Sequence, residues 1–191
     1  MDLVPSPSQT VGPFFHFCLT TDKNCVGRIA GPEVKGERVR LTVRVLDGDG
    51  VGPNDAMIEI WQADADGKYN HPDDTQSKAV DPSFLGFGRL NTAEDGSCEF
   101  ETIKPGRVPG PGNVLQAPHL NLAVFARGMI KQLYTRVYFA GDPANPEDPV
   151  LGLVPADRRE TLMAHPDTTR PGGWRFDLRL QGDDETVFFD V

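Results

Sequence analysis

Short segments in which apolar and polar residues alternate recur along the chain, and they constrain its fold more than any other feature. In ERVRLTVRVLD (37–47), every second residue from Val39 to Val45 is Val or Leu. This period of two is typical of a β-strand with one buried face. Further strands are expected at 56–64, 84–92, 97–103, 118–127, 131–139, 174–180 and 185–190. Turn-forming Gly, Pro, Asp and Asn separate them, which predicts an all-β fold, an antiparallel β-sandwich with long loops.

The length of the chain limits its domain organisation. Its 191 residues suffice for one substantial core and are few for two, so we expect a single domain over residues 1–191. Residues 1–15 are rich in Pro and polar side chains and are expected to form an extended N-terminal arm. The segment PADRRETLMAH (155–165) predicts one short helix.

Charge and cysteine content narrow the function. The net charge of −9 argues against a nucleic-acid partner, and an anionic substrate would need a local positive group. No segment approaches the roughly 20 apolar residues of a membrane span, and the N-terminus lacks the pattern of a signal peptide. Cys18, Cys25 and Cys98 have no C-x-x-C spacing, which favours reduced thiols and a cytoplasmic protein.

Motifs of several common chemistries are missing from the sequence. It contains no G-x-S-x-G, H-E-x-x-H or P-loop, so hydrolase and kinase functions have no support. The acidic turns at 47–55 and 64–68 do not supply the ligands of a calcium loop, and we interpret both as hairpin turns.

The strand PHLNLAVFAR (118–127) carries two polar residues, His119 and Asn121, that should share one face. Two histidines at this spacing would suit a metal, but an asparagine amide is a poor transition-metal ligand. The residues alone leave a metal site, a former metal site and an ordinary strand open, and favour a structural His119. His71 is expected in an exposed turn, and Trp61 and Trp174 in the core.

Longer stretches of the sequence resemble a known family, the intradiol ring-cleaving dioxygenases. The matching stretches are SQTVGPFFHF (8–17), IEIWQADADGKYNH (58–71), FGRLNTAEDGSCEFETIKPG (87–106), APHLNLAVFARG (117–128), LYTRVYFAGDP (133–143), RRETLMA (158–164) and RFDLRLQGDDETVFFDV (175–191). They follow in order over most of the chain, so the resemblance is more specific than one short motif.

The resemblance implies an enzyme of paired alpha and beta subunits that cleaves protocatechuate with O₂ to 3-carboxy-cis,cis-muconate, a step of aromatic catabolism. A beta subunit would hold non-haem iron(III) through two tyrosines and an H-x-H pair. On this chain the H-x-H falls on His119 and Asn121, one tyrosine on Val108 and the other near Gln76. One ligand of four remains. The resemblance therefore implies that this chain binds no metal, contributes no catalytic residue and works beside an iron-binding beta subunit.

The same resemblance implies that this chain completes the substrate pocket of its partner. The residues that match are Thr10, Pro13 and Phe14 of the arm, and Arg127. Phe14 stands where tyrosine is expected, so an aromatic wall is kept and a hydroxyl is lost. A guanidinium suits the carboxylate of a dihydroxybenzoate. A strand rises about 3.3 Å per residue, so the eight residues from His119 to Arg127 would separate them by roughly 25 Å. Arg127 would therefore serve not a site at His119 but a different site, across an interface.

Taken without the resemblance, Arg127 is an exposed arginine in a strand-end loop, and two other functions stay open. A non-enzymatic β-sandwich that binds a protein or a sugar would be stable without any dioxygenase partner. An autonomous metalloenzyme that uses His119 with His16, His71 or His165 would contain stoichiometric metal on its own.

Overall fold

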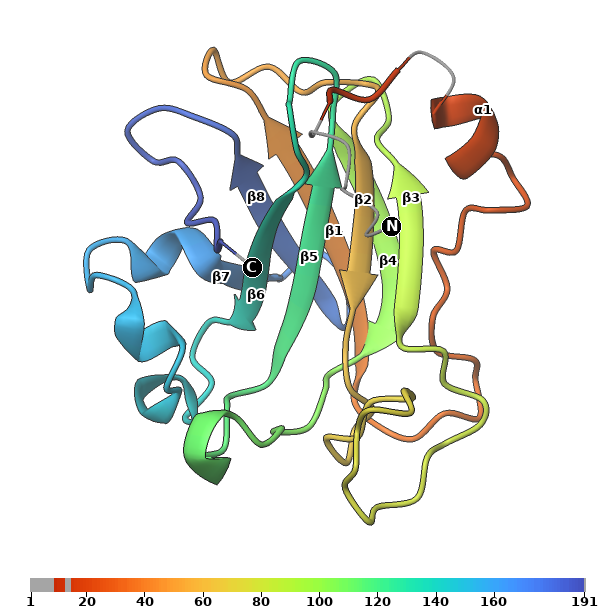
Figure 1. The fold of residues 1–191 in the computed structure, drawn as a ribbon, viewed down its shortest axis with the longest axis vertical. Helices are drawn as coiled ribbons and strands as arrows, with labels where there is room; N and C mark the ends of the chain where they lie inside the picture. Colours follow the sequence, from red (N-terminus) through yellow and green to blue (C-terminus); the bar gives the residue numbers. More distant parts are fainter. Residues whose placement is uncertain (1–8, 13–14, 191) are drawn as a thin grey trace, which may run out of the picture.

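A computed structural model describes residues 9–12 and 15–190 of the chain. Its framework is an eight-stranded sheet with the strand order β3-β2-β5-β6-β7-β8-β1-β4 (Figure 1). The strands are β1 (Arg38–Leu46), β2 (Met57–Trp61), β3 (Phe87–Asn91), β4 (Ser97–Ile103), β5 (His119–Phe125), β6 (Leu133–Phe139), β7 (Met163–Asp167) and β8 (Gly173–Arg179). The prediction of an all-β fold is confirmed. Each of these strands except β7 lies within a predicted segment or, as for β8, begins one residue before it.

The sheet curls so that β3, β2, β5 and β6 lie in front of β8, β1 and β4 (Figure 1). Alternate apolar residues of both halves form the main core, among them Leu41 of β1, Ile58 of β2 and Leu122 of β5, each at most 1% exposed. Residues 26–28 form bridges to both edge strands, β3 and β4. The edges therefore approach each other, and the sheet is nearly closed, like a barrel.

The prediction of an antiparallel sandwich needs correction, because the strands form one continuous and mixed sheet. β1 pairs in parallel with β8, and β6 pairs in parallel with β7. β7 is also antiparallel to β8, so it joins the two halves. Alternation of apolar residues determines which face of a strand is buried, but it contains no information about the direction of the neighbouring strand.

The short helix predicted at 155–165 is confirmed only in part. The segment contains a 3-10 helix (η4, Arg159–Leu162) and the start of β7. His165 precedes a proline, which disfavours helical backbone at that residue, and it pairs with Arg175 of β8. Three other short 3-10 helices are η1 (Pro111–Asn113), η2 (Asn145–Glu147) and η3 (Leu151–Leu153).

The two ends of the chain also differ from the prediction. Residues 185–190 form no strand within the sheet; Phe189 makes only an isolated bridge to Tyr134 of β6. Of the predicted arm, residues 1–8, 13 and 14 lie outside the described residues. The α-helix of the described part, α1 (Phe15–Leu19), begins where that arm was expected to end. No helix there is long and apolar enough to cross a membrane.

The connections between strands separate two regions that bear on function. The β2–β3 connection (62–86) and the β4–β5 connection (104–118) lie at the lower end of the sheet in Figure 1. The turn between β5 and β6 (126–132) lies at the upper end. β5 therefore joins the two regions, with His119 at its lower end.

Candidate functional site

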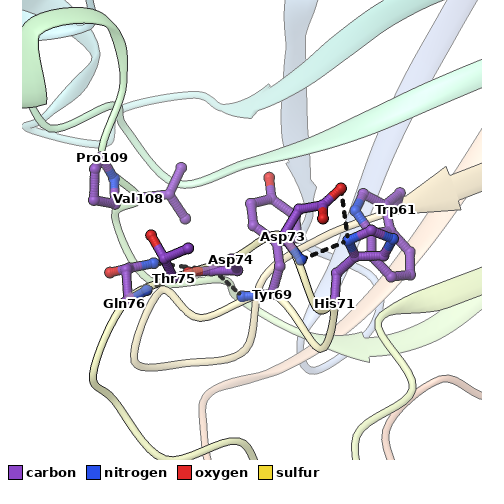
Figure 2. Close-up of a pocket in the computed structure, with 9 residues that line it drawn as sticks. All are labelled: Trp61, Tyr69, His71, Asp73, Asp74, Thr75, Gln76, Val108 and Pro109. Atoms are coloured by element: carbon purple, nitrogen blue, oxygen red, sulfur yellow. Dashed lines mark hydrogen bonds and ion pairs between the residues drawn. The ribbon is translucent and has the colours of Figure 1, made fainter.

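A pocket of about 370 Å³, here called the loop pocket, lies between the β2–β3 and β4–β5 connections (Figure 2). It is lined by Trp61, Tyr69, His71, Asp73, Asp74, Thr75, Gln76, Val108 and Pro109. Two of the positions matched to iron ligands, Gln76 and Val108, thus lie around one pocket although they are far apart in the sequence. His119 is not among the lining residues.

Aromatic rings form one wall of the loop pocket. The rings of Trp61 and Tyr69 stack at a centroid distance of 5.9 Å and an interplanar angle of 12°. His71 meets Trp61 edge-on at 6.2 Å, and its Nδ1 accepts a hydrogen bond from the backbone N–H of Asp73 at 3.2 Å. His71 is exposed, as predicted, whereas Trp61 is half-buried at the pocket and does not belong to the core.

Asn121 is connected to the loop pocket through Tyr69. Its side-chain amide donates a hydrogen bond to Tyr69 Oη at 3.1 Å and a longer one to the carbonyl oxygen of Trp61. Burial raises the pKa of Tyr69, although the hydrogen bond from Asn121 and the charge of Arg136 oppose this effect. Tyr69 is therefore a neutral phenol at pH 7, and Asn121 serves as its hydrogen-bond partner.

His119 is buried and neutral. Its side chain is 3% exposed, and Nδ1 donates a hydrogen bond to the carbonyl oxygen of Ala117 at 2.7 Å. Burial and the nearby charge of Arg136 lower the pKa of His119 to about 4. Its ring packs 5.7 Å from that of Tyr138. These contacts agree with the structural role that the residues alone favoured.

An internal ion pair fixes the β2–β3 connection beneath the loop pocket. Lys68 Nζ lies 3.2 Å from Asp74 Oδ1, with the two side chains only 6% and 9% exposed. Lys68 also donates to the carbonyl oxygen of Gln76 at 2.8 Å. Burial would raise the pKa of Asp74, but hydrogen bonds from Tyr69, Gln76 and Lys68 hold it at about 2. The Asp74 carboxylate is therefore ionised at pH 7, and its ion pair with Lys68 holds the loop.

The residues at the four matched positions do not fit an iron(III) site. Val108 has no donor atom, and the Gln76 amide donates to the Gly67 carbonyl oxygen and to Asp74. Asn121 offers an amide in place of an imidazole, and amides are poor ligands for this metal. Within residues 9–12 and 15–190, no group of three or more His, Cys, Asp or Glu side chains could hold a metal ion.

The second region lies at the other end of β5 and is here called the Arg127 edge (Thr10, Asp55, Arg127 and Gly128). The hydroxyl of Thr10 accepts a hydrogen bond from the backbone N–H of Gly128 at 3.1 Å, which brings the arm beside Arg127. Arg127 Nε forms an ion pair with the carboxylate of Asp55. Pro13 and Phe14, the other predicted substrate contacts, lie outside the described residues.

The structure thus separates the predicted residues into two groups. Thr10 and Arg127 lie together at one end of the sheet, while the positions matched to iron ligands gather at the other end (Figure 1). The strand β5 begins at His119 and ends at Phe125, two residues before Arg127, so it runs between the two groups. Arg127 and the loop pocket therefore lie in different regions of the molecule.

Comparison with known proteins decides the family. A family model described as "Dioxygenase" matches residues 10–182. The chain belongs to the dioxygenase family. It is 44% identical to the protocatechuate 3,4-dioxygenase alpha chain of Burkholderia cepacia, over 99% of this chain and 98% of that protein. It is 36% identical to the protocatechuate 3,4-dioxygenase beta chain of the same organism, over 94% of this chain and 77% of that protein.

Solved structures of dioxygenases share the fold. The dioxygenase domain of a carbohydrate-binding fusion protein from Streptomyces sp. SirexAA-E matches with a TM-score of 0.63 and 24% identity, over 96% of this chain and all of that one. At that identity the likeness concerns the fold alone. The resemblance drawn from the sequence motifs is confirmed by the family match and by the full-length relatives.

Sequence reasoning missed several residues of the two regions. Trp61, Tyr69 and Asp73 of the loop pocket were not assigned to a site, and neither was Asp55 of the Arg127 edge. Tyr69 and His71 lie within one of the stretches that carried the resemblance, which was the available signal. Asp55 could be found only from the pairing of β2 with β5.

Proposed function

We propose that this chain is the alpha-type, non-iron-binding subunit of a protocatechuate 3,4-dioxygenase. Its partner would be a beta-type subunit that holds the ferric iron and cleaves the catechol ring with O₂. The observation that carries the proposal is the set of residues at the loop pocket. Val108 and Gln76 line it and Asn121 is hydrogen-bonded to its Tyr69, but none of these three matched positions can supply a ligand for iron(III).

Identity to the relatives favours the alpha type over the beta type. The chain is 44% identical to an alpha chain that it matches almost end to end, and 36% identical to a beta chain of which it covers 77%. A chain that has lost the metal ligands and retains the fold is useful to the enzyme mainly through contacts with a partner that has kept them.

The contribution of this chain would come from the Arg127 edge. An exposed guanidinium there suits the carboxylate of protocatechuate and opposes the net charge of −9 locally. Thr10, hydrogen-bonded beside it, and Pro13 and Phe14 of the arm would complete the pocket wall. Residues 1–15 would contact the partner, with the rest of residues 1–191 forming one domain. The gain in rate would come from orientation of the substrate.

Coexpression tests this assignment. The chain is produced alone and together with a beta-type subunit, and protocatechuate consumption is followed by absorbance. We expect a stable hetero-oligomer of alpha–beta pairs with ring-cleaving activity, and no activity from this chain alone. Failure to associate with any beta-type subunit, with a stable and inactive solitary domain, would favour the non-enzymatic binding module instead.

The cytoplasmic location expected from the sequence stays a prediction. It draws support from the three cysteines, which form no disulfide with one another, and from Cys98, whose thiol pKa burial raises to about 12. Fractionation of cells that express the chain would test it.

A further inference from the structure

We infer that Asp55 is a positioning residue, which holds the guanidinium of Arg127 in the orientation that binds the carboxylate of a dihydroxybenzoate substrate. This inference rests on the proposed function and adds a residue that no motif marks. The carboxylate of Asp55 pairs with Arg127 Nε. The side chain of Asp55 is 16% exposed, whereas that of Arg127 is 71% exposed. A largely buried anion thus anchors an arginine whose end remains in solvent.

The pairing of β2 with β5 brings together the segments that carry these two residues. In this antiparallel pair, Trp61 lies opposite Asn121, and Met57 lies opposite Phe125. Asp55 and Arg127 lie two residues beyond the last paired residues, each in a turn that adjoins its strand end. The strand pairing thus sets the approach of the two turns, and the ion pair joins them.

The segment that carries Asp55 is held rigidly by Thr92. The Thr92 hydroxyl donates to the carbonyl oxygen of Pro53 at 2.6 Å and accepts from the backbone N–H of Ala56 at 3.1 Å. Thr92 is 1% exposed, and its own N–H donates to the Ala56 carbonyl oxygen at 2.9 Å. Hydrogen bonds to the backbone on both sides of Asp55 thus restrain the segment from which its carboxylate reaches Arg127, as a positioning residue requires.

The contact with Asp55 leaves most donors of Arg127 for a ligand. A guanidinium has five N–H donors, and the bond with Asp55 is made through Nε. Within residues 9–12 and 15–190, Arg127 forms no other ion pair. The terminal nitrogens Nη1 and Nη2 can therefore form two parallel hydrogen bonds with a substrate carboxylate. On the other side of Arg127, the hydrogen bond from Gly128 to Thr10 restrains the backbone.

Steady-state kinetics of the complex with the iron-binding subunit test this role. In Asp55→Asn, the KM for protocatechuate is expected to rise about tenfold, the size of effect of one lost charge-assisted contact, with kcat changed less. With catechol, which lacks the carboxylate, kcat/KM is expected to stay unchanged. Asp55→Glu keeps the anion and is expected to recover most of the KM. An unchanged or lowered KM in Asp55→Asn would overturn the inference; a lowered value would mean that Asp55 competes with the substrate.

Asp177→Asn is a matched control, because Asp177 pairs with Arg44 across β1 and β8 and its side chain is 41% exposed. We expect this variant to keep the wild-type KM. If Asp55→Asn does not assemble with the iron-binding subunit, Asp55→Ser allows the same comparison of KM values with a smaller side chain. If Asp55→Asn or Asp55→Ser raised the KM for protocatechuate and the KM for catechol equally, Asp55 would have a purely structural role, and the inference that it positions Arg127 would be refuted.

A double-mutant cycle separates this inference from the proposed function. On an Arg127→Met background, Asp55→Asn is expected to add no further change in KM, because the group that it positions is already gone. If Arg127→Met raises the KM and Asp55→Asn alone does not, the inference fails and the proposed function stands. If the wild-type complex does not cleave protocatechuate, the proposed function itself fails.

Discussion

At the scale of single residues, Arg127 is the side chain through which this chain would act on the substrate. It is exposed, anchored by Asp55 and adjacent to the hydrogen bond between Thr10 and Gly128. In Arg127→Met, the KM of the complex for protocatechuate should rise by about ten- to hundredfold, because a hydrogen bond to a charged group contributes about 1.5–3 kcal/mol. The turnover number should change less, since the proposed function places the chemistry on the partner. Initial rates with protocatechuate and catechol would measure both.

The control for this prediction is Arg175→Met, which removes an exposed arginine of β8, a strand that pairs with neither β2 nor β5. It should leave the KM at the wild-type value. A wild-type KM in Arg127→Met would remove the substrate role of that residue.

The lowered pKa of His119 predicts how the stability of the chain depends on pH. Its pKa is about 4 in the folded chain, against 6.5 for an ordinary histidine. The unfolded chain therefore takes up a proton first as the pH falls, so the stabilisation is complete above pH 6.5 and is lost as the pH approaches 4. Between pH 7 and pH 4.5 the free energy of unfolding should fall by about 2 kcal/mol. Urea unfolding of wild type and His119→Gln at both pH values measures this change, and it should be smaller in the variant.

Asp74→Asn is the control for the pH experiment, because the carboxyl of Asp74 has a pKa of about 2, against 3.8 for an ordinary aspartate. Its contribution to stability is present above pH 3.8 and is lost as the pH falls through 2. Between pH 7 and pH 4.5, the free energy of unfolding of this variant should therefore fall by as much as that of wild type. If His119→Gln lost as much stability as wild type, the assignment of that pH window to His119 would be refuted.

At the scale of elements, the β2–β3 connection keeps its shape without a metal because Lys68 and Asp74 pair inside it. Lys68→Met should lower the free energy of unfolding by about 3 kcal/mol, since it leaves a largely buried carboxylate without its partner. The double variant Lys68→Met/Asp74→Asn should lose less than the sum of the single variants. Denaturant unfolding of the isolated variants measures both effects.

Lys131→Met is the matched control, because Lys131 forms an ion pair with Asp190 in which both side chains are exposed. Such pairs contribute little to stability, so this variant should unfold like wild type. Equal stability of Lys68→Met and Lys131→Met would show that the internal pair does not fix the connection.

The elements also show what the sequence can and cannot predict. Alternation located β1 almost to the residue, since the buried residues Leu41 and Val43 follow the period of two. The composition of 155–165 predicted a helix, but only Arg159–Leu162 is helical, and pairing with β6 and β8 makes a strand from Met163 onward. The family motifs singled out Arg127, whereas its contact with Asp55 depends on the pairing of β2 with β5, which no local pattern contains.

At the scale of the whole molecule, the two ends of the sheet carry different kinds of residues. At the loop pocket, the positions matched to iron ligands hold Val108 and Gln76, with Asn121 hydrogen-bonded to Tyr69 of the same pocket. The Arg127 edge presents a cation at the opposite end, where a second subunit could use it. In the proposed function, this chain would therefore bind no iron and would serve the chemistry of its partner through the Arg127 edge.

Iron content is the most direct test of that division. Iron would be measured by elemental analysis in this chain purified alone from iron-replete cells, and in its complex with a beta-type subunit. We expect negligible iron in the chain alone and one iron per alpha–beta pair in the complex. One tightly bound iron per chain in the isolated protein would contradict it, and the loop pocket would then have to be treated as an active site.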